Sequence, residues 1–190
     1  MQDLAHTPIM ASRIWIALLR GVNVVGRRQV PMQELAATLQ RAGLKSVRTY
    51  IQSGNVLFQS ARGTARSLST QIAQLVERQF GFAPQVMVIS QQQLAEAIAG
   101  NPFPQAAQNH KALHLFFLSE EPTDPDLESL TRLQAGREAF ALKQGVFYLY
   151  TPDGFPDSKI AQKVERALGV HATARNWRTA NQLLAMAIQG

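Results

Sequence analysis

Short apolar runs alternate with stretches of helical periodicity along this chain, and their order restricts the fold more than any other feature. In residues 14–90 the order is strand, helix, strand, strand, helix, strand. The extended runs lie at 14–19, 47–52, 55–59 and 84–89, and helical spacing occurs over 31–42 and 64–80. This order is that of the split βαβ unit, which predicts a ferredoxin-like subdomain over 14–90.

The second half of the chain repeats the order with little residue identity, so the repeat is one of topology. Its extended runs lie at 112–118, 138–142, 146–150 and 171–174, its helices begin near Thr123 and Ser158, and a last helix covers 177–188. The prediction is an α+β protein with two tandem ferredoxin-like (split βαβ) subdomains, antiparallel sheets and a C-terminal helix. We expect a flexible tail over 1–13, subdomains over 14–90 and 111–190, and a short helix with a proline-containing linker over 91–110.

The composition limits the classes of function. With 190 residues and 46% hydrophobic content the chain can bury a sizeable core, and without cysteine it has no disulfide, thiolate zinc site or cysteine nucleophile. No apolar run approaches the roughly 20 residues of a membrane span. We expect a cytoplasmic protein that has no contact with membranes.

Positive charge is concentrated in the first third of the chain. The net charge is +6, and residues 1–60 hold seven Lys or Arg side chains against Asp3 and Glu34. An acidic partner would therefore meet this part of the protein first. The alternative is a solvated basic surface that only aids solubility.

The most site-like feature follows the first apolar run. Residues 14–19 end abruptly in Arg20, Gly21 and Asn23, a pattern typical of a buried strand that runs into a loop carrying a cation and free backbone N–H groups. Guanidinium groups suit bidentate contact with phosphate or carboxylate. Alternatively, Gly21 only allows the backbone to adopt the turn, and Arg20 forms an ion pair with a carboxylate.

The same loop does not match a nucleotide-hydrolase motif. Gly21 and Gly26 have the glycine spacing of a phosphate-cradling loop, but that motif continues with Lys and then Ser or Thr, where this chain has the Arg27-Arg28 pair. The pattern therefore indicates an anion-binding loop without the hydrolase machinery.

Two further segments are candidates. Ser53, Gly54 and Asn55 are interpreted as a tight hairpin turn, which needs no function and can lie at the opposite edge of the sheet from Arg20. The second segment is the start of the last helix. This segment contains Arg175, Asn176, Trp177 and Thr179. These residues indicate either a helix cap with a core anchor or an anion subsite.

The remaining chemistry-bearing residues give weaker signals. His110 and His114 have the i, i+4 spacing of helical zinc pairs, but they lie at the edge of an expected strand without the glutamate of the metalloprotease motif. Ser158 has no recognisable base nearby. We therefore predict no metal and no cofactor.

Strings from all three candidate segments resemble the bacterial domain-of-unknown-function family 1697. They are Leu-Arg-Gly-x-Asn at 19–23, Gln-Ser-Gly-Asn at 52–55 and Arg-Asn-Trp-x-Thr at 175–179, and the resemblance extends from about Ile14 to Ile188. Family members usually have isoleucine at the position of Val22 and glycine at that of Val25. The resemblance implies a compact, soluble bacterial α+β protein of two similar subdomains, with no activity or ligand to carry over.

Three hypotheses follow from the sequence. The first is a module that binds a phosphate-bearing or other anionic ligand, either a nucleotide or nucleic acid. The second is an enzyme that acts on a small anionic substrate, and the third is an interaction protein that pairs through a sheet edge, with itself or a partner. The sequence leaves open whether a reaction is catalysed. The predicted ligand-binding residues are Arg20, Gly21, Asn23, Ser53, Gly54, Asn55, Arg175, Asn176, Trp177 and Thr179.

Overall fold

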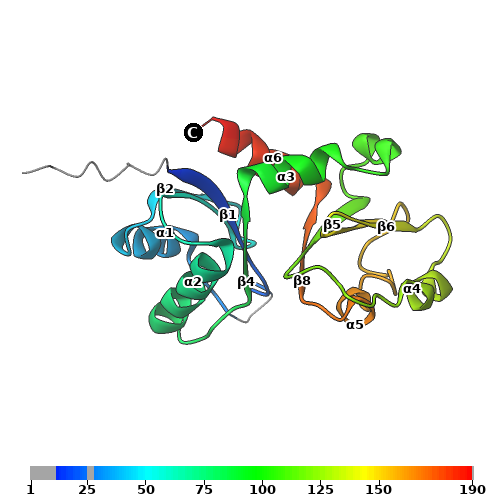
Figure 1. The fold of residues 1–190 in the computed structure, drawn as a ribbon, viewed down its shortest axis with the longest axis horizontal. Helices are drawn as coiled ribbons and strands as arrows, with labels where there is room; N and C mark the ends of the chain where they lie inside the picture. The colour runs from blue at the N-terminus through cyan, green and yellow to red at the C-terminus, as the bar shows by residue number, and fades with distance from the viewer. Residues whose placement is uncertain (1–11, 25–27, 190) are drawn as a thin grey trace, which may run out of the picture.

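The computed structural model describes residues 12–24 and 28–189, and Figure 1 shows its arrangement. Most of the tail expected over 1–13, and the loop residues Gly26 and Arg27, lie outside the described residues. Within the described part the fold is α+β, with six α-helices and two four-stranded antiparallel sheets. The described helices include none that is both long and apolar enough to cross a membrane.

The first sheet has the strand order β2-β3-β1-β4. Its strands are β1 (Arg13–Leu19), β2 (Lys45–Tyr50), β3 (Asn55–Ser60) and β4 (Val86–Ser90). The helices α1 (Met32–Arg41) and α2 (Ala65–Phe80) cover one face, and α3 (Gln91–Ala99) follows β4. A Ser90 and Gln93 capping box begins α3.

The second sheet has the equivalent order β6-β7-β5-β8, so the predicted repeat of topology is confirmed. Its strands are β5 (Leu113–Leu118), β6 (Ala139–Lys143), β7 (Val146–Tyr150) and β8 (Ala172–Asn176). The helices α4 (Leu127–Leu133) and α5 (Val164–Leu168) cover the outer face, and α6 (Trp177–Ile188) follows β8 directly.

Strand alternation separates the buried residues into an outer core on each sheet and one shared core between them. In β1, Trp15 and Leu19 point toward α1 and α2, while Ile16 and Leu18 point toward the second sheet. The shared core also contains α3 and α6, which pack against one another across the top of both sheets in Figure 1. Each sheet is therefore covered on both faces.

Four local expectations were wrong. The turn between β2 and β3 has four residues, 51–54, rather than the two of a tight hairpin, and α5 begins at Val164 because residues 158–163 form turns. Pro104 begins a short 3₁₀ helix (Pro104–Gln108) in the expected linker, since proline lacks an N–H that the first turn does not use. Asp126, rather than Thr123, caps α4 by accepting a hydrogen bond from the Ser129 N–H.

Candidate functional site

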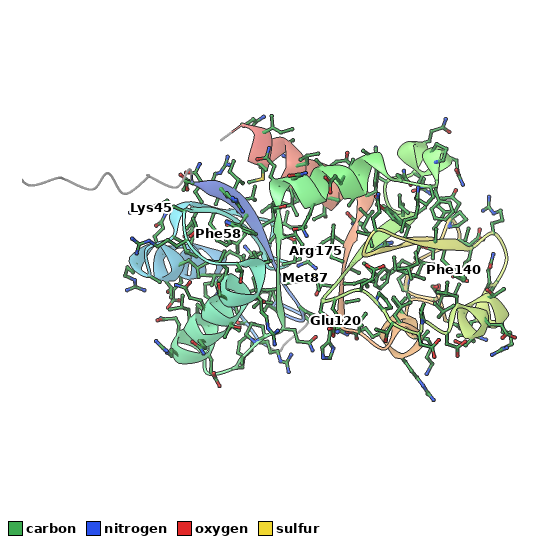
Figure 2. The ribbon with its side chains drawn as sticks, in the orientation of Figure 1. Lys45, Phe58, Met87, Glu120, Phe140 and Arg175 are labelled. Atoms are coloured by element: carbon green, nitrogen blue, oxygen red, sulfur yellow. The ribbon has the colours of Figure 1, made fainter. Side chains whose placement is uncertain are left out.

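The three segments with family-like strings meet where the two sheets adjoin. Arg175 extends from β8 toward the first sheet, and Figure 2 shows it between the two halves. Its Nη2 donates hydrogen bonds to the carbonyl oxygens of Leu19 (3.0 Å) and Ser53 (3.2 Å), and its Nε donates to Oδ1 of Asn55. Burial lowers the pKa of Arg175 to about 10, so the guanidinium stays charged at neutral pH. Arg175 thus joins the halves, and its donors are directed at protein oxygens rather than at a groove.

The expectation that the 53–55 turn could lie far from Arg20 was wrong. Because β1 and β3 are antiparallel, the end of β1 lies beside the start of β3, and the Leu19 N–H donates to the Gly54 carbonyl over 2.8 Å. A Cβ on Gly54 would lie 2.5 Å from Cγ2 of Val22 and 2.9 Å from Cβ of Leu19. The glycine therefore permits close contact between the two segments.

Two predicted asparagines hold loops in place. The Asn55 side chain is fully buried and donates to the carbonyl of Tyr50 while it accepts from Arg175. Asn23 adopts a left-handed backbone (φ 55°), and its Nδ2 donates to the carbonyls of Val30 (3.0 Å) and Gln52 (2.7 Å). These contacts close the loop after β1 and attach it to the 51–54 turn.

The start of α6 has the cap and the core anchor that the sequence offered as the alternative to an anion subsite. Oδ1 of Asn176 accepts a hydrogen bond from the Thr179 N–H over 2.8 Å, and both Trp177 and Thr179 are buried. Capping and burial at the helix start therefore explain the presence of Asn176, Trp177 and Thr179.

Arg20 occupies a different environment, at the mouth of a groove between the two halves. The groove has a volume of about 470 Å³, and residues from both halves line it. Nη1 of Arg20 donates to Oε1 of Gln85 over 3.0 Å and forms an ion pair with Oε1 of Glu165 in α5. The Arg20 side chain remains 43% exposed, so the ion pair leaves part of the guanidinium open to solvent. The lining residues are Arg20, Gly21, Arg28, Ala83, Gln85, Glu165 and His171.

Among the described residues, Glu165 is the single carboxylate that lines this groove. Its Oε1 accepts from Arg20 and from the Ala172 N–H (2.9 Å), and it lies 3.4 Å from Nδ1 of His171. Partial burial alone would raise the pKa of Glu165, but the hydrogen bonds from Arg20 and Ala172 outweigh it and lower that pKa. Glu165 is therefore ionised at neutral pH.

A second guanidinium reaches the groove from the loop after β1. Arg28 lies over the ring of Phe82, with its Cζ 5.8 Å from the ring centroid, in a cation–π contact. Its Nη1 is 3.5 Å from the position that a Cβ on Gly21 would take. This is an ordinary van der Waals distance, so glycine at this turn serves the left-handed backbone (φ 66°) rather than the space beside Arg28.

Sequence reasoning found part of this groove. Arg20 and Gly21 were predicted as ligand-binding residues, and the Arg27-Arg28 pair was noted as a source of guanidinium groups. Gln85, Glu165 and His171 were missed, because each lies far from Arg20 in sequence and outside any motif. The pairing of β1 with β4 brings Gln85 to Arg20, and the packing of one half against the other adds Glu165 and His171.

Two other grooves are less suited to anions. The largest, about 700 Å³, contains Lys45 and Arg62 beside the start of α2, but Thr64 and Ser67 already form a capping box there. A groove of about 310 Å³ is lined by three glutamates, Glu96, Glu120 and Glu121. Among the described residues there is no group of three or more His, Cys, Asp or Glu side chains that could hold a metal ion.

Comparison with known proteins agrees with the fold and leaves activity open. No curated protein matches the chain. A solved structure titled "The structure of conserved bacterial protein SP0830 from Streptococcus pneumoniae" is similar, with a TM-score of 0.69 and 22% identity over 93% of this chain and 99% of that one. Residues 13–148 match the family described as protein of unknown function (DUF1697). Because this match covers more than half of the chain, the protein belongs to the DUF1697 family.

Proposed function

We propose that the protein binds a small phosphate-bearing or other anionic ligand in the groove between its two halves. The observation that carries the proposal is the convergence of two guanidinium groups, Arg20 and Arg28, on a groove of about 470 Å³ whose described lining contains one carboxylate. The volume falls within the range of small-molecule sites. The groove contains Arg20 and Gly21 of the residues predicted from sequence, and the proposal depends on these two together with Arg28.

The charge balance of the groove favours an anion. Glu165 neutralises one guanidinium at most, and Arg28 contacts an aromatic ring rather than a carboxylate. The exposed part of Arg20 and the guanidinium of Arg28 offer several N–H donors in planar forks, which match phosphate and carboxylate oxygens. A charge-assisted hydrogen bond contributes about 1.5–3 kcal/mol, so two guanidinium groups are sufficient for measurable affinity.

Nucleic acid is a weaker candidate for the same ligand. In base-stacking sheets of this topology, aromatic side chains lie on the sheet face opposite the helices. Here those faces form the shared core: Ile16 and Leu18 in β1 and Leu115 in β5 are fully buried. A nucleic acid would have to bind through the rim of the groove and its phosphates alone, and the experiment below includes that outcome.

Three broader proposals accompany the binding site. The strand orders β2-β3-β1-β4 and β6-β7-β5-β8, with two helices on one face of each sheet, support a ferredoxin-like arrangement of the halves over 14–90 and 111–190. The bacterial source of the similar solved structure supports a bacterial origin. The absence of cysteine from the sequence is compatible with the cytoplasm, which cell fractionation would test.

Isothermal titration calorimetry with inorganic phosphate and with simple phosphomonoesters tests the binding site. The variant Arg28→Ala removes one guanidinium and leaves the Arg20 and Glu165 ion pair intact. We expect its affinity to fall by roughly 10-fold or more, because one or two charge-assisted hydrogen bonds are lost. The matched control is Arg132→Ala, which removes an exposed arginine that pairs with Glu128 on α4, away from the groove.

The possible results separate the alternatives. If the parent protein binds neither phosphate nor a phosphomonoester, or if Arg132→Ala weakens binding as much as Arg28→Ala, the proposed site is wrong. Fluorescence polarisation with labelled single-stranded and duplex oligonucleotides at two salt concentrations tests the nucleic-acid alternative. Tight, salt-dependent oligonucleotide binding that Arg28→Ala weakens would identify nucleic acid as the ligand.

A further inference from the structure

His171 lies at the rim of the proposed anion site, between a hydrogen-bond donor and a hydrogen-bond acceptor. It directly precedes β8, and its side chain is 72% exposed. Its Nδ1 is 3.3 Å from Nε2 of Gln85 and 3.4 Å from Oε1 of Glu165. One neighbour is an amide nitrogen and the other a carboxylate oxygen, so the proton on Nδ1 decides which of them the ring can bind.

Arg20 determines the orientation of the Gln85 amide. Oε1 of Gln85 accepts a hydrogen bond from Nη1 of Arg20, and a guanidinium group can only donate. The amide nitrogen of Gln85 must therefore face His171, and it is a donor. Neutral His171 can accept this hydrogen bond at a bare Nδ1 when its proton is on Nε2.

Protonated His171 needs a different partner. With a proton on both ring nitrogens, Nδ1 becomes a donor and can no longer accept from the Gln85 amide. The acceptor within reach is Oε1 of Glu165, which already accepts from Arg20. Protonated His171 can therefore donate to Glu165 beside Arg20, and the groove then holds three positive groups, Arg20, Arg28 and His171.

We propose that the groove takes up its anion together with one proton, with His171 as the third positive charge of the site. The charged and polar groups that line the groove with His171 come from three segments of the chain: Glu165 in α5, Arg20 and Arg28 in the loop after β1, and Gln85 before β4. An anion between the two arginines would replace Glu165 as the partner of Arg20 and leave that carboxylate for His171.

The coupling has a definite sign. Protonation of His171 adds a positive charge to the groove, so the affinity for an anion rises as the pH falls through the range in which histidine gains its proton. By thermodynamic reciprocity, a bound anion shifts the midpoint of the His171 titration to higher pH. This inference depends on the proposed function, because it describes the same groove.

Sulfate is a suitable probe, because it keeps its double negative charge over the relevant pH range, whereas phosphate itself titrates there. Calorimetric titration of the whole protein at about pH 5.5 and about pH 8 brackets the histidine transition. We expect sulfate to bind on the order of 10-fold more tightly at the lower pH. The His171→Gln variant should bind sulfate with nearly the same affinity at both pH values, and the control His110→Gln should behave like the parent.

Nuclear magnetic resonance of the imidazole protons gives an independent readout. The midpoint of the His171 titration should move to higher pH when sulfate is added, and that of His110 should not. Equal sulfate affinity at both pH values, or a pH dependence that persists in His171→Gln, would overturn the inference and leave the anion site in place. If the parent binds no sulfate at either pH, the proposed function and the inference fail together.

Discussion

Replacing Gly54 with alanine measures how much the close contact between β1 and the 51–54 turn contributes to stability. Gly54 has a φ of +73°, where an alanine costs about 1–2 kcal/mol because its Cβ crowds the backbone. The new Cβ would also lie 2.9 Å from Cβ of Leu19 and 3.0 Å from its carbonyl oxygen. Neither atom can rotate away, so overpacking adds about 1–3 kcal/mol. The expected loss in the free energy of unfolding is therefore about 2–5 kcal/mol.

The matched control is Gly81→Ala at the C-terminal cap of α2. Gly81 has a similar φ of +79°, but nothing lies within 4 Å of its added Cβ, so only the backbone cost of about 1–2 kcal/mol applies. Urea denaturation followed by circular dichroism gives the free energy of unfolding of each variant. The difference between the two variants isolates the contact with Leu19. A Gly54→Ala variant that loses no more stability than Gly81→Ala would refute the argument that this glycine is required by close packing.

Two further predictions concern buried polar groups. Arg175→Met should destabilise the protein by about 3 kcal/mol or more, because a charge-assisted hydrogen bond contributes about 1.5–3 kcal/mol and several carbonyls lose their donor. Urea denaturation measures the loss in the free energy of unfolding. A change below about 1 kcal/mol would contradict the prediction. Burial lowers the pKa of His114 to about 4, whereas an unfolded histidine gains its proton near pH 6.5. The unfolded state therefore binds the proton first as the pH falls. About 3 kcal/mol of the free energy of unfolding is lost between about pH 6.5 and pH 4. His114→Phe, which keeps the stacking on Phe155, should remove that part of the pH dependence in denaturation curves measured at each pH, and an unchanged slope would disprove the assignment to His114.

Local patterns were enough to predict the order of elements and the repeat. The continuous apolar run of β1 and the helical spacing of α2 are short-range features, and both are confirmed. The predicted Asn176 cap of α6 is also present. Helix and turn boundaries were less certain, since residues 158–163 have helical spacing but form turns over the buried Ile160.

The roles of the candidate residues required the tertiary structure. Nothing near Arg175 in sequence indicates that its guanidinium reaches the carbonyls of Leu19 and Ser53 in the other half of the chain. Equally, nothing near Arg20 indicates Glu165, its ion-pair partner 145 residues away. A cation at the end of a strand is compatible with a ligand site or with an internal bond, because both use the same donors.

The sequence by itself determined the class of fold, the repeat of topology, the exclusion of cysteine chemistry and the position of a cation after the first strand. Those properties depend on periodicity, composition and neighbours within a few residues. The tertiary structure decided which arginine is directed inward and which borders a groove, since that depends on how α6 packs against α3 and β3 and so brings the two halves together. Hydrogen-bond partners far apart in the chain are specified by packing, which no local pattern of residues encodes.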